Sequence, residues 1–127
     1  MTNMSPGQTR GRFLLLAVLT SCLAGSPAVA HAVLLESSPA PKSSVTGPDV
    51  PLKLRFNVRI DVARSRLTLI LPNGSSQALE VEKPGSPDLI SSQAKGLRPG
   101  AYVLRWQVLA SDGHITRGEI PFTVAAS

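Results

Sequence analysis

The sequence predicts an all-β fold, a β-sandwich of about seven short antiparallel strands. Three observations indicate this class. The 11 prolines and 10 glycines are spread along the 127 residues, as in chains whose many short strands are joined by turns. Several segments alternate apolar and polar residues, which is the period of a strand with one buried face. No segment shows a convincing helical period.

The first half of the chain provides four expected strands. The opening strand lies near residues 32–36, and the second covers residues 51–57. The third covers residues 66–71 and is followed by the turn Pro72-Asn73-Gly74-Ser75, because Asn-Gly accepts positive φ at low cost. The fourth returns over residues 77–81. The residues expected to share the inner faces of the second and third strands are Leu52, Leu54, Phe56, Leu67, Leu69 and Leu71.

The second half provides three more strands, at residues 88–94, 101–109 and 117–124. A loop at residues 83–87 precedes the first of them, and the turn Arg98-Pro99-Gly100 separates it from the second. The strand at 101–109 has the strongest pattern of the chain. The residues expected on the inner faces of the last two strands are Tyr102, Leu104, Trp106, Val108, Gly118, Ile120, Phe122 and Val124.

The first thirty residues have the features of a secretory signal peptide. Two arginines precede an apolar run at residues 13–19, and Ala28-Val29-Ala30 places small residues where a signal peptidase reads them. We therefore expect residues 1–30 to be removed and residues 31–127 to form a single domain in the periplasm. An alternative is that Leu19-Thr20-Ser21-Cys22 acts as a lipobox, in which case Cys22 would carry a lipid anchor.

Composition excludes several classes of function for the remaining chain. Both methionines and the single cysteine precede residue 31, so no disulfide and no sulfur ligand for a soft metal is expected. Two of the 13 Lys and Arg and none of the 8 acids precede residue 31, which leaves a net charge of +3. The basic residues are scattered rather than striped, so we expect no nucleic-acid partner. No later segment matches the apolar run, so we expect no membrane insertion of the processed chain.

The two histidines of the expected domain are its most informative residues. His31 would be its first residue, and an N-terminal histidine can chelate a metal through its α-amine and its imidazole Nδ1. Asp112 and His114 are two residues apart and project to the same side of an extended chain, with only Gly113 between them. Together these groups offer three nitrogens and one oxygen, a set that suits tetragonal Cu(II). Zn(II) would accept the same ligands as a tetrahedron.

Other interpretations fit the same residues. Asp112-Gly113-His114 is also a common turn, in which the aspartate caps a backbone N–H. An N-terminal histidine with a second histidine also forms the copper site of oxidative polysaccharide-cleaving enzymes, so an enzyme is one alternative. A metal-free, Ig-like interaction module is another. Glu80 and Glu82 face one way on an expected strand, but a solvated face explains them better than glycosidase chemistry.

Short motifs distributed from residue 31 to residue 124 carry a resemblance to a known family. They are His31-Ala32-x-Leu34, Ser38-Pro39-Ala40, Pro99-Gly100-x-Tyr102-x-Leu104-x-Trp106, Ser111-Asp112-Gly113-His114, Gly118 and Phe122-Thr123-Val124. In these motifs the chain resembles CopC-type periplasmic copper-resistance proteins.

The resemblance implies a Greek-key β-sandwich, Ig-like or cupredoxin-like, that binds one Cu(II) ion. Its ligands would be His31, through both amine and imidazole, Asp112 and His114. It also implies a copper carrier or scavenger rather than a catalyst, working in copper homeostasis and resistance, often beside a CopD-type inner-membrane protein.

The chain departs from the family pattern at two places. Some members have a Met-rich loop that forms a separate Cu(I) site, and residues 31–127 contain no methionine. Many members have an acid two residues after the Phe that ends the second strand, whereas Asn57 and Val58 follow Phe56 here. An auxiliary carboxylate is therefore not expected, and the sequence predicts no role for the segment from Phe56 to Asp61.

Overall fold

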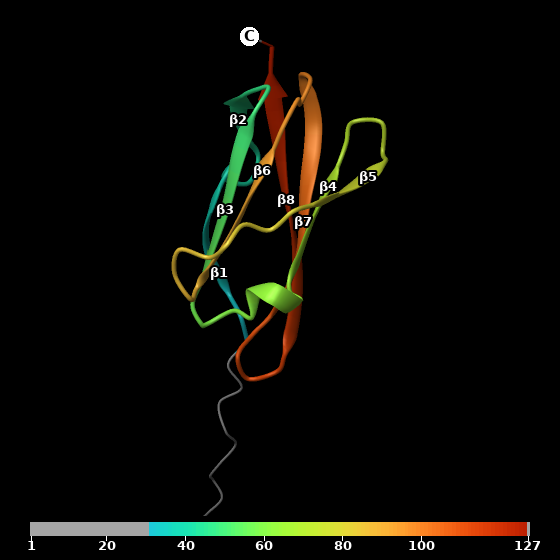
Figure 1. The fold of residues 1–127 in the computed structure, drawn as a ribbon. Helices are drawn as coiled ribbons and strands as arrows, with labels where there is room; N and C mark the ends of the chain where they lie inside the picture. The colour runs from blue at the N-terminus through green and yellow to red at the C-terminus, as the bar shows by residue number, and fades with distance from the viewer. Residues whose placement is uncertain (1–30, 127) are drawn as a thin grey trace, which may run out of the picture.

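Two β-sheets packed face to face form the part of the chain that this computed structural model describes, residues 31–126 (Figure 1). One sheet has three strands in the order β1 (Leu34–Ser38), β3 (Val50–Phe56) and β6 (Leu89–Ala94). The other has five in the order β2 (Ser43–Thr46), β8 (Ile115–Ala125), β7 (Gly100–Leu109), β4 (Arg66–Ile70) and β5 (Ser76–Leu79). The predicted all-β sandwich is confirmed. The predictions of a signal peptide and of a lipid anchor at Cys22 concern residues outside the described range.

The strand count and the pairing differ from the prediction at β2. The described residues form eight strands rather than seven, and β2 runs parallel to β8, so the expectation of antiparallel strands throughout is wrong there. The sequence Ser-Ser-Val-Thr contains only one apolar residue, Val45, and gives no alternation to detect. This strand exists because its backbone pairs with the edge of β8, which is a tertiary effect.

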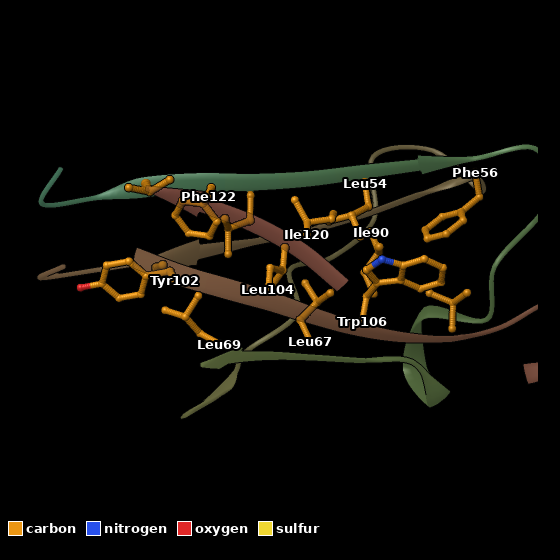
Figure 2. Close-up of a cluster of buried hydrophobic side chains, with 14 of the residues drawn as sticks. Leu54, Phe56, Leu67, Leu69, Ile90, Tyr102, Leu104, Trp106, Ile120 and Phe122 are labelled. Atoms are coloured by element: carbon orange, nitrogen blue, oxygen red, sulfur yellow. The ribbon is translucent and has the colours of Figure 1, made fainter. Parts of the chain in front are cut away.

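The predicted inner faces meet in one core (Figure 2). Alternate residues of β3 and of β7 are buried, as the period-two pattern requires. Phe56 and Trp106 pack edge to face, with ring centroids 5.1 Å apart. Burying a side chain of this size contributes about 1.5–3 kcal/mol, so these two strands supply much of the stability. Leu71 is an exception to the prediction, because it lies beyond the end of β4 and is only partly buried.

The turn predicted between β4 and β5 is present. The backbone N–H of Leu71 donates to the carbonyl of Ser75 at 2.9 Å, and Gly74 has φ +88°. The side-chain Oδ1 of Asn73 accepts a hydrogen bond from the backbone N–H of Ser75 at 3.0 Å. Gly74 therefore takes the positive φ that the sequence predicted, whereas Asn73 does not and acts through its side-chain oxygen instead.

Gly118 is the glycine whose substitution should cost the most stability. It lies opposite Trp106 in the β7–β8 pair, and a Cβ added there would stand 2.8 Å from the indole Nε1 and nearer still to the six-membered ring. Because Trp106 is buried against Phe56, we expect Gly118→Ala to lower the free energy of unfolding by about 1–3 kcal/mol.

Denaturant unfolding checks this expectation. Gly85→Ala is the matched control, because nothing lies within 4 Å of a Cβ built at that exposed loop position. Its effect should be neutral or slightly stabilising. Equal unfolding midpoints for the two variants would contradict the packing argument.

Candidate metal centre

The candidate ligands gather at one end of the sandwich. Asp112 and His114 lie in the turn that joins β7 to β8, and His31 lies three residues before β1. Figure 1 shows this turn beside the start of the described chain. The sandwich therefore brings His31, which precedes β1, and the β7–β8 turn to one place.

His31 and His114 are close neighbours in space. Their ring centroids are 5.4 Å apart and the ring planes are inclined at 70°. Both residues are exposed, so the rings have room to turn and solvent has access to them. Two imidazoles at this separation can reach one ion with modest side-chain rotation.

Asp112 is tied to His114 twice. The backbone N–H of His114 donates to Asp112 Oδ1 at 3.0 Å, and His114 Nδ1 lies 3.1 Å from Asp112 Oδ2. The backbone N–H of His114 is the main reason why the pKa of Asp112 is lowered from its ordinary value. Asp112 therefore carries a negative charge at neutral pH, next to both imidazoles. The capping turn that the sequence left as an alternative is thus present, and it places the carboxylate where a cation could meet it.

The turn itself is fixed by backbone bonds. Gly113 has φ +92°, and its N–H donates to the carbonyl of Ala110 at 2.9 Å. The N–H of Ala110 donates to the carbonyl of His114 at 2.8 Å. A glycine suits this position because a side chain is strained at positive φ. Gly113 thus both shapes the turn and leaves the two flanking side chains accessible.

The side chains of the predicted ligands do not yet surround a common metal position. Across residues 31–126, no three side chains of His, Cys, Asp or Glu are arranged to hold a metal ion. The side chains of His31, Asp112 and His114 would have to turn toward a common point to bind an ion. The fourth predicted donor, the α-amine of His31, is a peptide nitrogen until the bond after Ala30 is cut. A four-donor centre is therefore a property expected of the processed chain.

The segment from Phe56 to Asp61, for which the sequence predicts no role, runs between the two arms of this candidate centre. One arm is the chain that follows His31, and the other is the β7–β8 turn. On one side, the N–H of Asn57 donates to the carbonyl of Val33 at 3.1 Å. On the other, the N–H of Ser111 donates to the carbonyl of Arg59 at 3.1 Å. The only hint of this arrangement in the sequence is that the segment follows directly on a buried strand.

The remaining candidates from the sequence do not join this site. Glu80 and Glu82 follow β5 and are exposed, in agreement with a solvated face. Tyr102 and Trp106, which the strand pattern placed on an inner face, are buried in the core. Within residues 31–126, the structure contains no helix with the length and apolar character needed to cross a membrane.

Comparison with known proteins gives consistent matches. Residues 34–125 match the family model described as CopC domain. Protein YobA of Escherichia coli K12 is 31% identical over 112 residues, which are 86% of this chain and 90% of that protein. Copper resistance protein C of Xanthomonas campestris pv. juglandis is 28% identical over 117 residues, 86% of this chain and 91% of that protein. The crystal structure of CopC from Methylosinus trichosporium OB3b has a TM-score of 0.67 and 31% identity, covering 75% of this chain and 94% of that one.

Proposed function

The chain belongs to the CopC family of copper-resistance proteins, and from this premise we propose that it is a periplasmic carrier that binds one Cu(II) ion. Its ligands would be the α-amine and imidazole of His31, the carboxylate of Asp112 and the imidazole of His114. The observation that supports this most directly is the approach of the two imidazoles, 5.4 Å between centroids, beside an ionised carboxylate. Three nitrogens and one oxygen favour Cu(II) over ions that prefer sulfur or oxygen alone.

The exposure of the centre supports a carrier rather than a catalyst. His31, Asp112 and His114 all lie at the surface and are open to solvent. An ion held there can pass to another protein by exchange of ligands. Under this proposal the recipient or donor is a partner such as a CopD-type inner-membrane protein. Asp112, as a ligand, would also occupy a position that oxygen chemistry needs open.

Intact mass of the secreted protein, measured with and without one equivalent of Cu(II), tests the proposal. We expect a chain that begins at His31 and gains the mass of one copper ion. A chain that begins at a lipidated Cys22, or one that begins at His31 and takes up no copper, would favour the metal-free interaction module. Turnover of hydrogen peroxide by the copper-loaded protein would favour the enzyme alternative.

Copper affinity should fall as the pH is lowered from neutral to about 5. Protons compete with copper for the amine and imidazole nitrogens, which bind metal only when deprotonated. The pKa of Asp112 is lowered, so its carboxylate stays ionised over this range and does not cause the loss. A competition titration with a chelator at several pH values measures the effect. An affinity that does not change with pH would contradict the nitrogen-rich ligand set.

A further inference from the structure

The processed chain would carry its first copper ligand on a terminal residue, which has no preceding chain to hold it. Ordering such a residue for binding costs conformational entropy, and this cost weakens binding unless the residue is held in place beforehand. The structure shows two successive anchors directly after His31. Ala32 is only 3% exposed and is part of the core, and both the N–H and the carbonyl of Val33 are hydrogen-bonded to Asn57.

The contact between Val33 and Asn57 extends the β1–β3 pairing past the ends of both strands. The last backbone register pair on this side is Leu34 with Phe56. Beyond it, the N–H of Asn57 donates to the carbonyl of Val33 at 3.1 Å, and the N–H of Val33 donates to Asn57 Oδ1 at 2.7 Å. In a continued antiparallel ladder, the N–H of Val33 would donate to a backbone carbonyl of the neighbouring strand. Here the side-chain oxygen of Asn57 accepts that hydrogen bond instead.

The same segment holds the other arm of the centre. After Asn57, Ile60 forms an isolated antiparallel bridge with Ala110, and the N–H of Asp61 donates to the carbonyl of Leu109 at 2.8 Å. The N–H of Ser111 donates to the carbonyl of Arg59 at 3.1 Å. Residues 57–61 therefore touch the chain two residues after His31 and the chain just before Asp112. We call residues 57–61 the bracket.

We infer that the bracket sets the spacing between His31 and the Asp112–His114 turn, and that Asn57 is the positioning residue for the N-terminal copper ligand. This inference rests on the proposed function. Among the bracket's hydrogen bonds to the two arms, the one accepted by Asn57 Oδ1 depends on a side chain, whereas the others join backbone groups. Asn57 is thus the position where a substitution can loosen the His31 arm and leave the fold in place.

Asn57→Ala removes this acceptor. In the processed, His31-starting protein we expect about five- to tenfold weaker Cu(II) binding, the equivalent of one ordinary hydrogen bond. Asn57→Asp keeps an acceptor oxygen at the same reach and should retain the affinity. In the metal-free protein, the amide hydrogen of Val33 should exchange faster with solvent in Asn57→Ala than in the parent.

Asn73→Ala is the matched control. Asn73 is also an exposed asparagine whose Oδ1 accepts a backbone N–H, from Ser75, but it lies in the β4–β5 turn. Because Asn73 Oδ1 also accepts from Ser75 Oγ at 2.7 Å, Asn73→Ala should lower the unfolding midpoint at least as much as Asn57→Ala and leave copper affinity unchanged. This separates positioning of His31 from a general loss of stability.

The outcomes distinguish the inference from the proposed function. If the parent binds copper and Asn57→Ala binds it equally tightly, the inference is overturned and the function stands. The inference is also overturned if Asn57→Asp loses as much affinity as Asn57→Ala, or if Asn73→Ala weakens copper binding to the same extent. If the parent itself binds no copper, the proposed function fails and the inference fails with it.

Discussion

A chain that retains one extra residue before His31 is expected to bind Cu(II) more than about 100-fold more weakly than the chain that starts at His31. The added residue converts the α-amine into a peptide nitrogen, so both a ligand and the chelate ring it forms with Nδ1 are lost. Mutating a residue that only hydrogen-bonds to a metal ligand typically lowers metal affinity by about 10–100-fold. Loss of a direct ligand should lower it further. Competition titration against a chelator of known affinity measures the difference.

The fold should not change with this extension, because His31 is exposed and precedes β1. Equal unfolding midpoints for the extended and the His31-starting chains would show this. One alanine added after Ser127 is the control for chain length, and it should leave copper affinity unchanged. Full affinity in the N-terminally extended chain would exclude the amine as a ligand and would require a different donor set.

Strand prediction succeeded where one face of a strand is continuously buried. In β3 and β7 the alternation runs for seven and ten residues, and the predicted inner residues are those that the core contains. It failed at β2, whose single apolar residue Val45 gives no period. A short strand of that kind is stabilised by the partner to which its backbone pairs, and the partner is not encoded in the strand's own sequence.

The candidate site was predictable in part for a different reason. The described residues contain two histidines, so the pairing of His31 with His114 needed only that the start of the domain and the β7–β8 turn lie at the same end of the sandwich. The role of Asn57 was not predictable. Its side chain accepts from the backbone N–H of Val33, and any residue except proline would offer that N–H. Whether Asn57 lies opposite Val33 depends on the register between β1 and β3. A hydrogen bond from a side chain to a backbone N–H therefore produces no pattern of residue types in the sequence.

His114→Ala is expected to weaken Cu(II) binding by more than about 100-fold while leaving the turn intact. The hydrogen bond that Asp112 Oδ1 accepts comes from the backbone N–H of His114, which alanine also has. The bonds of Gly113 and of His114 to Ala110 are likewise between backbone groups. The substitution therefore removes an imidazole without removing the structure that carries it, and an exposed position should cost little stability.

Copper affinity and the unfolding midpoint, measured on the same preparation, separate the two interpretations of this turn. Glu80→Ala is the control, because Glu80 is exposed and is not among the proposed ligands. It should change neither quantity. If Asp112-Gly113-His114 is only a capping turn, His114→Ala will bind copper as the parent does, and the centre must then be sought without this imidazole. If His114→Ala loses copper at an unchanged midpoint, the imidazole itself is the ligand, because the backbone of the turn is the same in both chains.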